Sequence, residues 1–345
     1  MEIGIGLDAT LNLTFEEQAQ LAQEAARLGY TSIWTPETTG YDSFQTCAVR
    51  WEATRQVVPG GLTTGIAVSP VALRTPMSLA MGGGTVSART GGRFILGIGS
   101  GGLYREEERR ALGIKGSTIG LMRDYLTTVR ALVAGETVTY EGTALTLRGA
   151  HLAIEPPPRT PVHLGALGPQ MLRLGGERAD GVDLNWCTPD QIAWSRECVA
   201  EGAARTGRDP SSVTVAEYIR VCVDDDVELA RRTFVRNMLG YALGRHGAGA
   251  RDRNLGYRAH FERMGFTQEL SHLDEMRSGG ASLPQLADAF PAEMALRVGY
   301  FGRAAGAAKA FRSLAKGLDI AVVRVVAARP GVEQVLATLR ACRPT

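Results

Sequence analysis

Short runs rich in β-branched residues alternate with stretches of helical period along most of the chain, the pattern of a parallel sheet with crossover helices. The predicted strands are EIGIGL, TSIWTP, LTTGIAV, RFILGIG, VHLGAL, GVDLNW, VTVAEYIRVCV and LDIAVVRVV. Eight strand-and-helix units fit a closed (β/α)8 TIM barrel better than a doubly wound open sheet. No Pro-, Ser- or Gly-rich linker divides the chain, so residues 1–345 are predicted to form a single TIM-barrel domain.

Several helix ends are visible in the sequence. Thr14 with Glu17 three residues later is a capping box, and Gly29 is a typical stop signal. Further helices are predicted to begin at Pro76, Pro169 and Pro189, because proline suits the first turn of a helix. These helices follow predicted strands directly, as the barrel pattern requires.

Two segments depart from the strand-and-helix repeat. Residues 136–150 predict a β-hairpin insertion that turns at Glu141-Gly142. Residues 226–315, before the last strand, begin with helical period and predict a helical insertion that forms a lid. Its middle, GRHGAGARDRNLGYR, places Arg245, Arg251, Arg253 and Arg258 among glycines, the composition of a mobile loop or lid. Such a loop either clamps an acidic cofactor tail or an anionic substrate through its arginines or is simply solvated.

Composition limits the partners and the compartment. The net charge of +2 provides no general attraction to nucleic acid or to an anionic membrane. The five cysteines are scattered without a C-x-x-C pair, and no histidines have metal-ligand spacing, so we expect neither disulfides nor a metal site. We expect no signal peptide, because the start of the chain lacks a basic region and a long apolar run. We expect no membrane span, because no stretch approaches the roughly 20 apolar residues needed to cross a bilayer. A reducing cytoplasm fits these features.

A glycine-rich stretch, GGRFILGIGSGG, contains Gly97, Gly99 and Gly102 at the spacing G-x-G-x-x-G. One interpretation is the pyrophosphate turn of a dinucleotide-binding domain, which opens a helix directly. The other is the glycine-rich mouth of a different α/β fold. The charged stretch LYREEERRALGIKGST follows instead of an immediate strong helix, so the dinucleotide motif is poorly matched.

In a barrel the chemistry lies at the C-terminal ends of the strands. In order along the chain these ends are Asp8, TPETTGYDSF, AVSP, SGG, LGPQM, NW, Arg220 and Arg324. The motifs SIWTPETTGYDSF, GIAVSPVALRTPMSLA, GGRFILGIGSGG, RALVAGETVTYEG and PVHLGALGPQMLRLGGERADGVDLNW together resemble the bacterial-luciferase-like oxidoreductases, especially the branch that uses the deazaflavin coenzyme F420. The resemblance covers about residues 1–225 and the last strand.

The resemblance implies a barrel with a flavin or deazaflavin ring at its C-terminal mouth, facing a pocket roofed by insertions. It implies a cis peptide bond between Ala67 and Val68 in a bulge that supports the ring, and strand-four glycines that let the backbone approach the cofactor. The cofactor-binding residues expected from it are Ala67, Val68, Ser69, Ser100, Gly101, Ala166, Leu167, Gly168, Pro169, Gln170, Met171 and Asn185.

Within that set, Ser100 and Gly101 are expected to bond the polar edge or side chain of the cofactor. The free amides of Gln170 and Met171 at a helix start are expected to bind a phosphate. A purely structural strand-to-helix turn is the alternative there. Asn185 and Trp186 are expected to complete the cofactor pocket, with core packing as the alternative for Trp186.

The departure from the family pattern lies after the second strand. Many F420-dependent relatives carry Asp-His there, whereas this chain has Glu37 and Thr38, which are the expected catalytic residues. Glu37 acts as a general acid or base if burial raises its pKa, or else orients the ring. In the second case Thr38, Tyr41, Glu217 or Arg220 handles the proton. A structural pairing of Glu37 with an arginine is the remaining alternative.

The leading hypothesis is an F420-dependent oxidoreductase. It would transfer hydride between the reduced deazaflavin C5 and an activated C=C or C=N bond of a small natural-product or peptide intermediate. The alternatives are an FMN-dependent luciferase-like monooxygenase and a catalytically silent cofactor-binding protein. A homodimer is compatible with the sequence.

Overall fold

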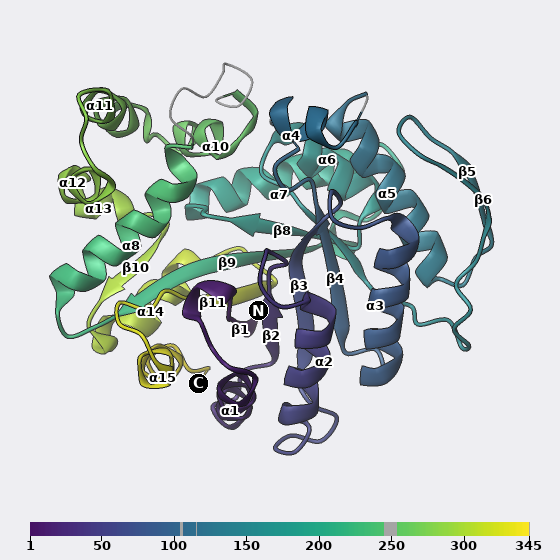
Figure 1. The fold of residues 1–345 in the computed structure, drawn as a ribbon, viewed down its shortest axis with the longest axis horizontal. Helices are drawn as coiled ribbons and strands as arrows, with labels where there is room; N and C mark the ends of the chain where they lie inside the picture. Colours follow the sequence, from purple (N-terminus) through teal and green to yellow (C-terminus); the bar gives the residue numbers. More distant parts are fainter. Residues whose placement is uncertain (104–105, 115, 245–253, 345) are drawn as a thin grey trace.

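The computed structural model describes residues 1–103, 106–114, 116–244 and 254–344. Eight parallel strands close into a barrel, as predicted, and the pairing of β8 with β9 completes the circle (Figure 1). In the order in which they neighbour one another, the strands are β1 (Glu2–Gly6), β2 (Ser32–Thr35), β3 (Thr63–Pro70), β4 (Phe94–Gly99), β7 (Val162–Gly165), β8 (Gly181–Asn185), β9 (Thr214–Val223) and β11 (Ile320–Val325).

Helices cover the outside of the barrel. They are α1 (Phe15–Arg27), α2 (Ser43–Thr54), α3 (Pro76–Thr90), α5 (Thr118–Val133), α6 (Pro169–Arg178), α7 (Pro189–Ala204), α14 (Ala304–Leu314) and α15 (Val332–Ala341). The Thr14–Glu17 capping box forms, and Gly29 follows α1 with a φ of 87°, as the sequence predicts. Short helices η1 (Ala9–Leu11), α4 (Glu106–Ala111) and η2 (Pro210–Ser212) lie between them. In the described part of the chain, no helix is long and apolar enough to cross a membrane.

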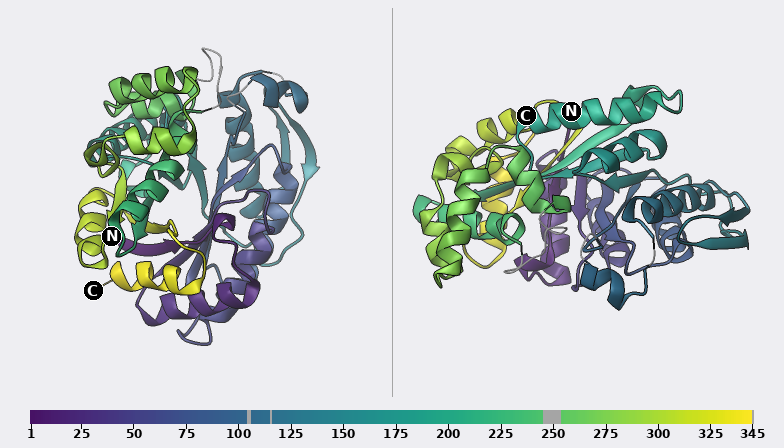
Figure 2. Two further views of the ribbon diagram at one scale, coloured as in Figure 1. Left: turned by 60° about the vertical axis from the view of Figure 1, so that its left-hand side comes forward. Right: turned by 90° about the horizontal axis from the view of Figure 1, so that it is seen from above.

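Two insertions leave the barrel on opposite sides (Figure 1). The predicted hairpin consists of β5 (Val138–Glu141) and β6 (Thr146–Ala150), and its turn occupies residues 142–145 rather than Glu141-Gly142 alone. The elements of the second insertion lie together around its first helix, α8, in the views of Figure 1 and Figure 2. It contains α8 (Val227–Ala242), α10 (Tyr257–Arg263), α11 (Thr267–Ser278), α12 (Leu283–Ala289), α13 (Ala292–Ala295) and β10 (Gly299–Gly302).

The second insertion differs from the prediction in two ways. It is not purely helical, because β10 pairs in parallel with the far end of β9, from Arg220 to Val223. Arg258 does not belong to a loop: it is buried in α10, where it bonds Glu262 and Asp274 at 2.6 and 2.7 Å. Carboxylates of its own insertion therefore neutralise Arg258. Arg245, Arg251 and Arg253 lie outside the described residues.

The hydrophobic core has three parts. The largest fills the space between the strands and the outer helices, and a second fills the insertion, where Phe234, Phe261 and Phe266 pack together. The third lies inside the barrel, where Trp34 and Tyr218 are the large side chains. Gly65 makes room for the first of these, since a Cβ atom added there would lie 2.4 Å from the Trp34 ring. The barrel is thus a packed core and leaves space for chemistry only at its mouth.

Candidate functional site at the mouth of the barrel

The bulge in β3 lies where the cis peptide was expected, and the bond between Ala67 and Val68 is cis. The register with β4 shifts between Ile66 and Ser69. The Val68 carbonyl accepts a hydrogen bond from the Glu37 amide at 3.2 Å, which joins the bulge to the end of β2.

The strand-four glycines make room for neighbouring parts of the barrel. A Cβ atom on Gly99 would lie 2.5 Å from Val68 Cγ2, and one on Gly97 would lie 2.2 Å from the Ile66 carbonyl oxygen and 2.5 Å from Asp183 Oδ2. Both positions must therefore be small so that the bulge and the Asp183 side chain fit. The dinucleotide interpretation is wrong, because β4 belongs to a closed barrel.

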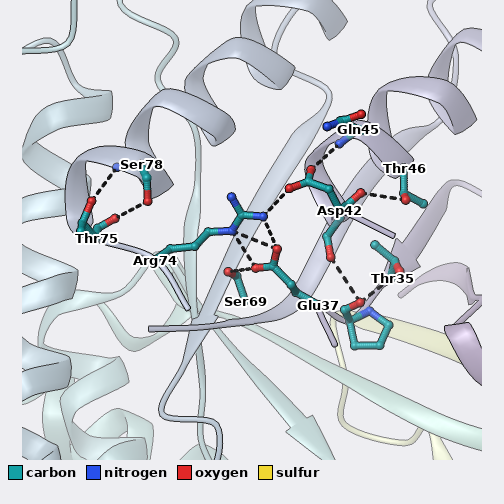
Figure 3. Close-up of polar contacts among 11 residues, drawn as sticks. Thr35, Glu37, Asp42, Gln45, Thr46, Ser69, Arg74, Thr75 and Ser78 are labelled. Carbon is teal, nitrogen blue, oxygen red and sulfur yellow. Dashed lines mark hydrogen bonds and ion pairs between the residues drawn. The ribbon is translucent and has the colours of Figure 1, made fainter. Parts of the chain in front are cut away.

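Glu37 lies in a cluster of charges at the rim (Figure 3). Arg74 Nε donates to both carboxylate oxygens of Glu37 at 2.9 Å, and the Ser69 hydroxyl donates a further short hydrogen bond. Arg74 also pairs with Asp42, and its hydrogen bond to Glu37 is the main reason that the pKa of Arg74 is raised. Burial alone would raise the pKa of Asp42, but the Gln45 amide and Arg74 together lower it.

This rim cluster of Glu37, Asp42, Ser69 and Arg74 is the arginine pairing considered from the sequence. Both oxygens of the buried Glu37 carboxylate are engaged as acceptors, so Glu37 ties the bulge, through Ser69, to Arg74 near the end of the β3–α3 connection. The neighbouring Thr38 is exposed.

The start of α6 has the form of an anion site. Gly168 is the N-cap residue and supplies no side-chain hydrogen bond, and Pro169 occupies the first turn. The first amides of a helix lack intrahelical partners, so those of Gln170 and Met171 point outward from an uncapped end. Ser100 and Gly101 follow β4, the strand that pairs with the β7 strand preceding Ala166 and Leu167. The Leu167 carbonyl accepts a 2.8 Å hydrogen bond from Arg263 of α10, which fixes the insertion to this edge of the mouth.

Asn185, the last residue of β8, and Trp186, which follows it, hold Arg220 of β9. The Asn185 Oδ1 atom accepts a short hydrogen bond from Arg220, while Nδ2 lies 2.6 Å from the Tyr257 hydroxyl. The Arg220 guanidinium lies 4.0 Å from the centre of the Trp186 ring. Trp186 is fully buried among the aromatic residues of the insertion, so core packing is its observed environment.

Two other residues considered for proton transfer, Glu217 and Tyr41, do not line the pocket found at the mouth. The Ala216 and Tyr218 side chains face the barrel interior, so Glu217 between them faces outward, where its carboxylate accepts a hydrogen bond from the Cys187 amide at 2.6 Å. Burial raises the pKa of Glu217 to about 8. Tyr41 is 57% exposed and packs on Phe15 at a ring distance of 4.4 Å.

The histidines that the structure describes are packed or exposed, in agreement with the sequence. His163 bonds Asp183 at 2.9 Å inside the barrel. His260 bonds the Trp186 carbonyl at 2.9 Å, and burial lowers its pKa to about 4. His151 and His272 are exposed, and among the described residues no cluster of ligands could hold a metal ion.

A pocket of about 470 Å³ opens between the mouth and α8. The barrel contributes Asp8 and Thr10 beyond β1, Arg220 of β9, and Arg324 to Ala328 of β11 and its continuation. Helix α8 contributes Thr233, Arg236, Asn237 and Tyr241, and Leu11 and Leu283 complete the wall. We call this space the mouth pocket. Sequence reasoning missed its α8 wall, although positions 233, 237 and 241 recur at the four-residue spacing of one helix face.

The family model described as luciferase-like monooxygenase matches residues 2–318. The chain belongs to this family. This luciferase-like protein is 31% identical over 215 residues to a 5,10-methylenetetrahydromethanopterin reductase of Methanolobus tindarius, a match that covers 62% of the chain and 63% of that relative. A coenzyme F420-dependent tetrahydromethanopterin reductase from Methanopyrus kandleri has the same fold, with a TM-score of 0.76, 20% identity, and coverage of 99% and 97% of the two chains.

A second solved structure, an F420-dependent secondary alcohol dehydrogenase in complex with an F420-acetone adduct, also shares the fold. Its TM-score is 0.74 at 17% identity, and the match covers 99% of each chain. The luciferase-like barrel predicted from the motifs is therefore confirmed.

Proposed function

We propose that this luciferase-like protein is an F420-dependent oxidoreductase that acts on an activated C=C or C=N bond of a small natural-product or peptide intermediate. The observation that carries the proposal is the mouth pocket, which lies over β9, β11 and β1, with only β2 separating these strands from the β3 bulge. A planar ring supported by the bulge would have an open space beside it. The similarity to a methanopterin reductase and to F420-dependent folds supports deazaflavin as the ring.

The residues present fit such a cofactor. Ala67, Val68 and Ser69 would support the ring from the bulge, and the uncapped amides of Gln170 and Met171 would bind its phosphate. Ser100, Gly101, and the connection Ala166, Leu167, Gly168 and Pro169 would line the path between ring and phosphate, with Asn185 beyond them. When bound, the reduced deazaflavin supplies a hydride at C5.

The protein positions the reactants and excludes water. Effective transfer needs donor and acceptor carbons within roughly 3–3.5 Å, which the packed barrel below and α8 above the mouth pocket can enforce. Glu37 holds the bulge through Ser69, so we assign it a positioning role, with the hydroxyl of the adjacent, exposed Thr38 as the candidate for proton transfer.

Parallel titrations of the purified protein with oxidised F420 and with FMN test the cofactor. We expect saturable quenching of F420 fluorescence. Tight FMN binding without F420 affinity would overturn the proposal in favour of an FMN-dependent monooxygenase, the second candidate, which the family description supports. F420 binding without oxidation of the reduced cofactor by any acceptor would identify a silent binding protein.

A further inference from the structure

The mouth pocket carries an excess of positive charge. Three guanidinium groups line it, those of Arg220, Arg236 and Arg324, against one carboxylate, that of Asp8. Asp8 is already committed, because it pairs with Arg324 and accepts a hydrogen bond from the Thr10 amide at 2.8 Å. The other two guanidinium groups, those of Arg220 and Arg236, therefore face the space without a paired carboxylate among the described lining residues.

Arg220 is the buried one of these two. It is 3% exposed, and among the described residues its hydrogen bonds go to neutral acceptors, such as Asn185 Oδ1 and the Tyr218 carbonyl. Its guanidinium packs between the rings of Trp186 and Tyr241, at 4.0 and 5.1 Å from their centres. Burial lowers its pKa. Glu217 lies on the opposite face of β9 and bonds a backbone amide; the charge of Arg220 partly offsets the rise in its pKa, but no hydrogen bond or ion pair is observed between these two residues.

A buried guanidinium without a paired anion is costly, and the usual compensation is a charged hydrogen-bonding partner. Arg236 stands on the α8 wall of the same space, and within the described chain it makes no ion pair or hydrogen bond. The two cations come from opposite walls, one from the barrel and one from the insertion, which is the arrangement of a clamp.

Two further buried atoms in the pocket wall have no hydrogen-bond partner in the part of the chain that the structure describes. They are Nη1 of Arg324, whose side chain is 5% exposed, and Oδ1 of Asn237. A buried polar atom without a partner costs free energy until something bonds it. The wall thus offers one more donor for an anion and one acceptor for an N–H or O–H group.

We propose that the substrate of this protein carries an anionic group, a carboxylate or a phosphate, which the mouth pocket binds between Arg220 and Arg236. The unpartnered Nη1 of Arg324 supplies a third donor, and Asn237 accepts a hydrogen bond from an N–H or O–H group of the same molecule. This inference rests on the proposed function, because it places the anion in the space beside the ring and the phosphate of the cofactor at α6.

The test uses inorganic phosphate and acetate as probes, titrated into the full-length protein at constant ionic strength. Binding is followed by the change in tryptophan fluorescence, because Trp186 is stacked on Arg220. A Trp186→Phe variant shows how much of that change comes from Trp186. A clamp of two guanidinium groups predicts a dissociation constant on the order of 1 mM for the better probe. Preference for phosphate or for acetate distinguishes the two kinds of anionic group.

Arg236→Gln should weaken the binding of that probe by roughly tenfold or more, because a charge-assisted hydrogen bond is lost. This variant removes an exposed side chain, so the fold should tolerate it. Arg220→Gln should abolish binding. The matched control is Arg232→Gln on the same helix, whose side chain pairs with Glu228 and Asp288 outside the pocket and which should bind like the wild type.

The F420 titration is run on the same samples, so that the two proposals fail separately. The anionic-substrate inference alone is overturned if the wild-type protein binds F420 but its fluorescence shows no saturable response to phosphate or acetate. The anion concentration should reach about ten times the expected dissociation constant. Equal binding by the Arg236→Gln and Arg232→Gln variants overturns the inference as well. Anion binding without F420 binding leaves the clamp standing and overturns the proposed cofactor.

Discussion

Replacing Glu217 by glutamine should make the stability of this protein much less dependent on pH. Glu217 is 1% exposed, and burial raises its pKa from an ordinary value of 4.5 to about 8. Between these two pH values the folded protein keeps a proton that the unfolded chain releases. The stability contributed by the neutral group is therefore complete below the unfolded pKa and is lost as the pH rises through the folded pKa.

The size of the effect follows from the two pKa values. Between about pH 5 and about pH 8 this single group costs the wild type about 3.5 kcal/mol of folding free energy. Glutamine does not ionise, and its carbonyl oxygen can still accept the 2.6 Å hydrogen bond from the Cys187 amide. The stability of Glu217→Gln relative to wild type should therefore rise by about that amount over the same interval.

Urea denaturation of both proteins at a series of pH values measures this difference. The control is Glu201→Gln, which changes a largely exposed carboxylate paired with Arg173 and should give a curve parallel to that of the wild type. If the free energy of unfolding of Glu217→Gln depends on pH in the same way as that of the wild type, Glu217 is not a neutral acid with a raised pKa in the folded protein.

Three further substitutions test the mouth. Gly99→Ala should destabilise the protein by about 1–3 kcal/mol in denaturant unfolding, because the new methyl group would meet Val68, and adding Val68→Ala should recover most of the loss. Gln170→Glu should weaken F420 binding roughly tenfold in a fluorescence titration, because a carboxylate beside the α6 amides competes with a phosphate. Arg74→Gln should cost about 1–3 kcal/mol in the same unfolding assay by leaving the Glu37 carboxylate buried without its cation, and the double variant with Glu37→Gln should be more stable than Arg74→Gln alone.

Each of these substitutions has a matched control. Gly240→Ala, in α8 with no atom near the added methyl group, should be neutral or slightly stabilising. Gln268→Glu in the first turn of α11 adds the same charge at a helix start in the insertion and should leave F420 binding unchanged. If Gly99→Ala is as stable as Gly240→Ala, the close contact between position 99 and Val68 is contradicted. If Gln170→Glu and Gln268→Glu bind F420 equally well, the phosphate site at α6 is contradicted. An Arg74→Gln variant as stable as the wild type would contradict the importance of the rim cluster.

The barrel could be predicted from the sequence because its signals are local. Strand runs, proline starts and capping residues each act within a few positions, and their order along the chain is enough to indicate eight repeated units. The β10 strand was missed because Gly299–Gly302 is only four residues long and lies inside a helical segment. The available signal was the length of β9, whose second half extends past β8 and needs another partner on that edge.

The side chains of the site were harder to predict, because their partners are far away in the sequence. Glu37 meets Arg74 across two strands, and the space at Gly97 is filled by Asp183 from β8. Arg258 has the glycine-rich flank of a loop, yet a carboxylate of α11 draws it into a buried helix. The sequence shows that such residues are polar or small, but it does not reveal which distant residue bonds the polar group or fills the space beside the small one.

The two walls of the mouth pocket come from parts of the chain that can change independently. The barrel wall is fixed by strand register, whereas Thr233, Asn237 and Tyr241 project from a helix that folds against its own aromatic cluster. Randomising these three positions would thus generate a library in which the lining of the pocket varies while the barrel wall stays unchanged. Gene duplication followed by substitutions on α8 could diversify the pocket in the same way.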